Sequence, residues 1–185
     1  MGKAGTQTAA LAFGGANFDI APPYYSDATE EYDGSTWTTS PASMNTARGF
    51  LASAGAGTQT AALAFGGQPV TAVTESYNGI TWTTVNSLNT PRQQLAGSGT
   101  QTAALAFAGV APGPALTGAT EEYDGTSWTN SPASLSVARY ALSSSGTQAS
   151  ALAFGGKKAP TFQGSTDTEE WTGSGVGVTK TITVS

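Results

Sequence analysis

GTQTAALAFGG occupies residues 5–15, and the same residues return unchanged at 57–67. A close variant, GTQTAALAFAG, stands at 99–109, and another, GTQASALAFGG, at 146–156. Successive copies begin 52, 42 and 47 residues apart. Repeats of this length are typical of four-stranded blades or of helix pairs, and they are too long for ankyrin or leucine-rich units. The chain therefore consists of one unit repeated four times.

Two further blocks recur in phase with the first. The segment after each copy reads TEEYDGSTWTT from Thr29, TESYNGITWTT from Thr74, TEEYDGTSWTN from Thr120 and the divergent TEEWTGSGVGV from Thr168. The other block reads NTARGFLASAG, NTPRQQLAGSG and SVARYALSSSG, and it places all the arginines of the chain at one repeat position: Arg48, Arg92 and Arg139. Equivalent positions can therefore be compared across repeats.

The residue types favour strands over helices. Thr, Gly and Ser are abundant, whereas helix formers are scarce. Asp33-Gly34, and its counterparts Asn78-Gly79 and Asp124-Gly125, lie between β-type runs and suit a two-residue type I′ hairpin. Such a loop would place Tyr32 opposite Ser35 and Glu30 opposite Trp37.

The repeat unit divides into four expected strands. In the second repeat these lie near 49–55, 59–66, 74–77 and 81–85. The strand at 59–66 is apolar on both faces, which predicts a sheet covered on both sides. The small residues at 49–55 suit an innermost strand, where space is short. The loops at 16–28, 68–73, 110–119 and 157–167 vary most.

An apolar strand ending in Gly-Gly, then a Tyr, a Trp and an Arg before the next strand, resembles the kelch repeat. The matching residues are Gly14, Gly15, Tyr32, Trp37 and Arg48, then Gly66, Gly67, Tyr77, Trp82 and Arg92, then Gly109, Tyr123, Trp128 and Arg139, then Gly155 and Gly156. Ala108 replaces one glycine, and Trp171 stands where Tyr is expected. The resemblance implies an all-β fold, a four-bladed kelch-like β-propeller of four-stranded antiparallel blades. Residues 1–185 would form one domain with blades at about 1–39, 47–85, 91–130 and 138–185.

The phrases GTQTAALAFGG and TEEYDG, with the ending VTKTITVS, also resemble repeat proteins of marine bacteriophages. This second resemblance implies a non-enzymatic structural or attachment protein of a virion or tail, located in the virion or outside the cell. Its partners would be other virion proteins or copies of itself. The alternative is a lectin-like module that binds a cell-surface glycan through loop aromatics.

The composition argues against most catalytic chemistry. The chain has no cysteine and no histidine, so it lacks disulfides, thiolate nucleophiles, histidine relays and the usual zinc ligands. Seven basic residues are a weak footprint for nucleic acid, and no apolar run is long enough to span a membrane. The aspartates at 19, 27, 33, 124 and 167 lack calcium-loop spacing. We therefore expect no catalytic residues, no metal and no cofactor.

The recurring charged and aromatic residues have a simpler structural interpretation. Adjacent glutamates such as Glu30 and Glu31 point to opposite faces of a strand, so they cannot flank one bond. One glutamate recurs in every repeat, and we expect it to pair with the recurring arginine. The tryptophans at one repeat position should pack between blades. These structural residues are Glu30, Glu75, Glu121, Glu169, Arg48, Arg92, Arg139, Trp37, Trp82 and Trp128.

The first variable loop carries the best candidate for a binding site. Phe18, Tyr24 and Tyr25 lie within it, and Phe162 and Gln163 lie in the equivalent loop of the last repeat. If the ring closes, the two loops become neighbours and form one aromatic patch. The alternative is that these rings only cover blade ends or an oligomer contact.

The two ends of the chain are compatible with two ways of closing the ring of blades. Residues 1–4 would be a stub of the innermost strand of the first blade, and residues 176–184 alternate like a last strand. Either four blades close on themselves, or the open edge pairs with another chain, which allows an eight-bladed ring. The opening run looks like a signal peptide, but its copy at 57–67 is internal, so we expect a strand and no secretion signal.

Overall fold

The computed structural model describes residues 1–18, 22, 24–161 and 163–173, and within these ranges the chain is all β. Sheet 1 has the order β1 (Gly2–Thr6), β2 (Ala9–Ala16), β3 (Tyr25–Tyr32) and β4 (Trp37–Thr39). Sheet 2 has the order β5 (Ala52–Ser53), β6 (Ala62–Phe65), β7 (Thr74–Tyr77) and β8 (Trp82–Val85). Both are antiparallel meanders, as the repeat predicts.

The second half of the chain follows the same plan. Sheet 3 has the order β9 (Ala96–Thr100), β10 (Ala103–Ala111), β11 (Ala115–Tyr123) and β12 (Trp128–Ser134). Sheet 4 has three described strands, β14 (Ser143–Gly146), β15 (Ala151–Phe154) and β18 (Thr168–Trp171). A small sheet joins β13 (Arg139–Tyr140), β16 (Lys157–Lys158) and β17 (Gln163–Gly164). The last strand expected at 176–184 lies outside the described residues.

The innermost strands of the first two repeats, β1 and β5, differ in length from the prediction. The first is no stub, because β1 pairs with β2 along its whole length, from Gly2 opposite Phe13 to Thr6 opposite Ala9. In the second repeat, β5 is shorter than the predicted 49–55, because Phe50 has a φ of 51° and cannot extend the strand. The residues that precede β5 form a linker, and the linker carries the arginine.

The hairpin register is also different from the prediction. Tyr32 lies opposite Trp37 rather than Ser35, and Glu30 lies opposite Thr39. Asp33 does not have the positive φ that a type I′ turn requires; its side chain instead accepts hydrogen bonds from the backbone amides of Ser35 and Thr36, both at 2.8 Å. The loop is thus two residues longer than expected, and Tyr32 and Trp37 still share a face.

These turns predict a specific dependence on pH. Backbone amides of Thr36 and Ser35 lower the pKa of Asp33, and those of Ser127 and Thr126 lower the pKa of Asp124. Their stabilisation is present above the unfolded pKa of about 3.9 and is lost as the pH falls through the folded pKa. Asn78 makes the same turn without a charge, with its Oδ1 accepting from Ile80 and Thr81.

A double Asp33→Asn, Asp124→Asn variant should therefore keep most of its stability at pH 7. Its melting temperature, followed by circular dichroism, should fall less steeply than that of the wild type as the pH is lowered below about 4. Parallel curves for the two proteins would show that other carboxylates dominate the acid response.

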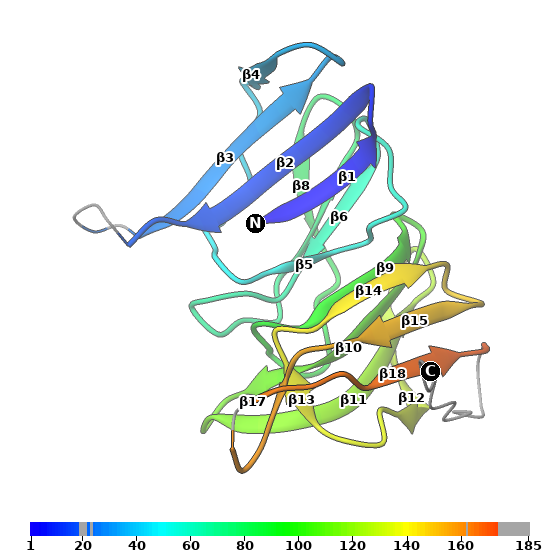
Figure 1. Cartoon of the computed structure of the whole chain (residues 1–185). Helices are drawn as coiled ribbons and strands as arrows, with labels where there is room; N and C mark the ends of the chain where they lie inside the picture. The colour runs from blue at the N-terminus through cyan, green and yellow to red at the C-terminus, as the bar shows by residue number, and fades with distance from the viewer. Residues whose placement is uncertain (19–21, 23, 162, 174–185) are drawn as a thin grey trace.

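Three hydrophobic cores hold the four sheets together, one between each consecutive pair. In Figure 1 the sheets follow one another from sheet 1 in blue to sheet 4 in yellow and orange, with β1, β5, β9 and β14 nearest one another. Backbone bonds join these inner strands and their turns, from Gly5 N to Gly57 O and from Ala56 N to Gly99 O, both at 2.9 Å. A shared depression is lined by residues of all four inner edges, among them Lys3, Gly55, Gly97 and Ser144.

The outer faces of sheets 1 and 4 remain uncovered in the described part of the chain. Trp37 on sheet 1 is 51% exposed, and Phe154 on sheet 4 is 37% exposed, whereas their counterparts on inner faces are buried. The sheets therefore have the form of successive blades, with three inner junctions and two free outer faces.

Candidate functional site

Each arginine lies ahead of a sheet and sends its side chain into it, and we call this arrangement the latch. The backbone of Arg48 is held by sheet 1, because Gly15 N donates to its carbonyl at 2.8 Å and its own amide donates to Ser26 O at 3.1 Å. Arg92 is held in the same way by Gly67 and Thr71 of sheet 2.

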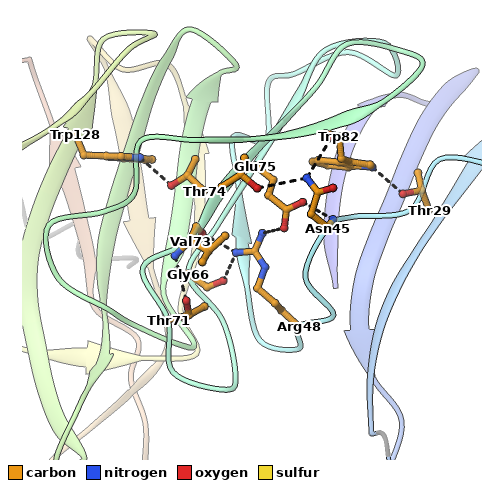
Figure 2. Close-up of polar contacts among 11 residues, drawn as sticks. Thr29, Asn45, Arg48, Gly66, Thr71, Val73, Thr74, Glu75, Trp82 and Trp128 are labelled. Carbon is orange, nitrogen blue, oxygen red and sulfur yellow. Dashed lines mark hydrogen bonds and ion pairs between the residues drawn. The ribbon is translucent and has the colours of Figure 1, made fainter.

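The arginine side chain then enters the following sheet. Figure 2 shows Arg48 reaching Gly66, Val73 and Glu75 of sheet 2. Its Nη1 donates to the two carbonyls at 2.8 and 2.6 Å, and its Nη2 donates to Glu75 Oε1 at 2.9 Å. The other oxygen of Glu75 accepts the backbone amide of Asn45, at 2.6 Å. The glutamate thus binds the linker at two points.

Arg92 repeats this geometry, and Arg139, which lies in β13, repeats the ion pair. Arg92 donates to Glu121 at 2.8 Å and to the carbonyls of Ala108 and Ala119, and Arg139 donates to Glu169 at 2.8 Å. All three arginines are fully buried, and so is Glu75. Burial lowers the pKa of Arg48 and of Arg92, while the paired glutamate opposes this shift. A guanidinium nonetheless stays charged in proteins, so each latch is a buried ion pair.

Glu30 is the exception among the recurring glutamates. It occupies the equivalent position on sheet 1, but it is exposed and has no arginine beside it in the described ranges. The expected glutamate–arginine contact is therefore present on sheets 2, 3 and 4 and absent from sheet 1.

The tryptophans of the hairpins also differ between sheet 1 and the later sheets. Trp82 packs its edge against Phe13 of sheet 1, with ring centroids 4.8 Å apart, and its Nε1 donates to Thr29 Oγ1 at 2.9 Å. Trp128 does the same with Phe65 and Thr74 of sheet 2. Among the described aromatic rings, Trp37 pairs with Tyr32 of its own sheet, with centroids 5.1 Å apart, so it does not pack between sheets as predicted. Within the described ranges, no other sheet lies against this face of sheet 1.

Trp171 makes the third aromatic junction from a different position. It replaces the tyrosine of the other repeats, and its ring meets Phe107 of sheet 3 at 6.3 Å. The contact is longer than the other two, and it comes from β18 rather than from the hairpin's second strand.

A further contact between sheets, which we call the glutamine clamp, is not predicted by the sequence analysis. The glutamine of each GTQ turn reaches back to the preceding sheet, where Gln59 Nε2 donates to the carbonyls of Ala10 and Tyr32 at 3.1 and 2.9 Å. Gln101 and Gln148 make the equivalent bonds to sheets 2 and 3. The recurrence of this glutamine at 7, 59, 101 and 148 was the available signal.

An exposed aromatic cluster lies at the variable loop of sheet 1, and we define it as Phe18, Tyr24, Tyr25 and Phe50. Phe18 is at its centre, with ring centroids 5.7 Å from Tyr24, 6.3 Å from Tyr25 and 6.1 Å from Phe50. Phe18 is 58% exposed. The structure thus brings together the three predicted rings of this loop and adds Phe50, which the linker's left-handed φ turns away from the strand.

The aromatic cluster borders an open hollow of about 820 Å³. Asn17, Asp27 and Glu30 add polar groups to its lining. Of the two residues expected from the last repeat, Gln163 lies exposed in β17 and does not line the hollow, and Phe162 lies outside the described residues. The site therefore belongs to sheet 1 and its linker.

The acidic side chains of the described ranges do not gather at a metal centre. These ranges contain no group of three or more acidic side chains placed to hold a metal ion. Asp33 and Asp124 are engaged in turns, and Asp167 pairs with Lys158 at 2.9 Å. A membrane-spanning helix is likewise absent from the described segments.

Comparison with models of known protein families gives no match, and no curated protein matches the chain. The resemblance to kelch repeats therefore rests on the recurring residues and on the form of the sheets.

Proposed function

We propose that the protein is a kelch-like β-propeller that serves as a non-enzymatic structural or attachment protein of a phage particle, in the virion or outside the cell. It acts through protein–protein contacts, with other virion proteins or with copies of itself. The observation that carries this proposal is the exposed aromatic cluster on a rigid stack of sheets. Exposed aromatic rings that gather in one patch mark interaction surfaces.

The scaffold supports the same proposal. Its three arginines and three of its four recurring glutamates form latches, and the side chains of Asp33 and Asp124 close their own turns. Such an architecture presents loops at a fixed geometry, which suits attachment rather than chemistry.

Immunogold labelling tests the structural role. Antibodies raised against the purified chain should label phage particles that carry the gene, at a fixed position on the particle. Gene product found only in the infected cell, with unlabelled particles, would contradict the proposal.

A glycan-binding module is the second candidate, and the aromatic cluster favours it as well. Aromatic faces beside Asn17 and Asp27 offer stacking and hydrogen bonds at one hollow. If this alternative holds, the wild type will bind a subset of a glycan array, and Tyr24→Ala will lower that binding at least tenfold. Ile80→Ala is the control, since Ile80 is 77% exposed on a turn of sheet 2. Equal signals from all three proteins would remove the glycan candidate.

A further inference from the structure

The three junctions between sheets share two contacts, although the third takes its tryptophan from β18 and that indole donates to Gln148 O rather than to a threonine. At each one, a phenylalanine of the earlier sheet meets a tryptophan of the later sheet: Phe13 with Trp82, Phe65 with Trp128, and Phe107 with Trp171. At each one, a glutamine of the later sheet also clamps two carbonyls of the earlier sheet. A junction therefore has two distinct halves, one contributed by each sheet.

Sheet 1 presents the later half of a junction with no partner. Its glutamine, Gln7, is exposed and makes no hydrogen bond in the described part of the chain, and Trp37 is 51% exposed against 5% for Trp82 and Trp128. The surface beside Trp37 forms a hollow of about 760 Å³, whose lining includes Lys3, Ala10, Ala12 and Glu30. We call this surface the head face.

Sheet 4 presents the earlier half, which we call the tail face. Phe154 is 37% exposed, whereas Phe13, Phe65 and Phe107 are at most 1% exposed. Ala151 lies opposite Trp171, just as Ala10 lies opposite Tyr32 where Gln59 binds. Thr168 stands where Thr29 and Thr74 accept the tryptophan Nε1.

We propose that the head face binds the tail face of a second copy of this chain. Trp37 packs on Phe154 and donates from its Nε1 to Thr168, and Gln7 clamps the carbonyls of Ala151 and Trp171. The contact is heterologous, because two different surfaces meet. Two chains of four sheets close into a ring of eight, which lies within the known range of propellers.

One observation favours a second copy over closure within one chain. The match of the aromatic, threonine and glutamine positions suits both arrangements, and Glu30 has no arginine beside it in the described ranges. In the described structure, however, sheets 2 and 3 lie between the two faces, and Trp37 and Phe154 both remain exposed. The inference rests on the proposed structural role. Its test measures the mass of the protein in solution, whereas the test of the structural role labels phage particles, so each hypothesis can fail without the other.

The test is a complementation experiment with the full chain. A head variant carries Gln7→Ala and Trp37→Ala, and a tail variant carries Phe154→Ala and Thr168→Ala. Light scattering after size exclusion should give twice the 18.5 kDa of one chain for the wild type and for the Ile80→Ala control. Each variant alone should have the mass of one chain. An equimolar mixture should recover dimer, because it restores one intact head-to-tail contact.

Circular dichroism at low concentration checks that both variants fold, and this is expected because their altered aromatic residues are exposed. A wild type with the mass of one chain at all concentrations overturns the proposal; blue-shifted emission from Trp37 would then indicate closure within the chain. A dimer that survives in both variants, or a mixture that stays monomeric, also overturns it.

Discussion

Replacement of Arg92 by alanine should lower the free energy of unfolding by about 3–5 kcal/mol, because it leaves Glu121 buried without its cation. Arg92 is fully buried and donates to Glu121 and to the carbonyls of Ala108 and Ala119. In a domain of this size, 1 kcal/mol shifts the melting temperature by roughly 2–4 °C. Urea titration and thermal melts should therefore separate this variant clearly from the wild type.

Lys157→Ala is the matched control, since Lys157 is an exposed cation outside the latches, and its stability should stay close to wild type. Arg92→Lys should recover only part of the loss, because one ammonium cannot reproduce the geometry of two guanidinium nitrogens. An Arg92→Ala, Glu121→Gln double variant should be more stable than Arg92→Ala alone. Equal effects of Arg92→Ala and Lys157→Ala would refute the latch.

Truncation of Trp128 to alanine should cost about 3–5 kcal/mol, whereas the same change at Trp37 should cost about 1 kcal/mol or less. Trp128 fills the core between sheets 2 and 3, stacks near Tyr123 at 5.0 Å and bonds Thr74 at 3.0 Å. Trp37 occupies the same repeat position but is 51% exposed and, among the described rings, pairs with Tyr32 of its own sheet. Because both variants replace a tryptophan at the same repeat position, the difference between their stabilities measures the contribution of the neighbouring sheet.

Both tryptophan variants should be measured at the lowest practical protein concentration, so that association does not add to the stability of the wild type. A large effect of Trp37→Ala under these conditions would show that another surface covers this ring. Similar small effects at both positions would mean that the junctions contribute little to folding.

The repeat made most of the fold predictable. Four in-phase copies located β2, β6, β10 and β15, and the Asp-Gly and Asn-Gly pairs located the hairpins. The register failed because Asp33 caps its own turn: its carboxylate accepts two backbone amides, which lengthens the loop by two residues. The Asp-Gly pair is common both in type I′ turns and in turns where the aspartate side chain accepts backbone amides, so the pair alone does not tell the two apart.

The site was less predictable, because its differences depend on neighbours distant in sequence. Because Glu30 and Glu75 share a repeat position, both are expected to pair with an arginine. For the same reason, Trp37 and Trp82 are both expected to pack between sheets. Their environments differ because, within the described residues, no other sheet covers the face of sheet 1 that carries Glu30 and Trp37. Phe50 was assigned to a strand, and its place in the aromatic cluster depends on a φ of 51° that its sequence does not indicate.

The position of each arginine ahead of the sheet that it binds has a consequence for the evolution of the protein. A gene segment that runs from one arginine codon to just before the next encodes one complete sheet and brings both halves of a junction with it. Duplication of the segment for residues 48–91 would therefore add a sheet that fits its neighbours without any new contact. Recombination between such similar segments would change the number of sheets while every interface stayed the same.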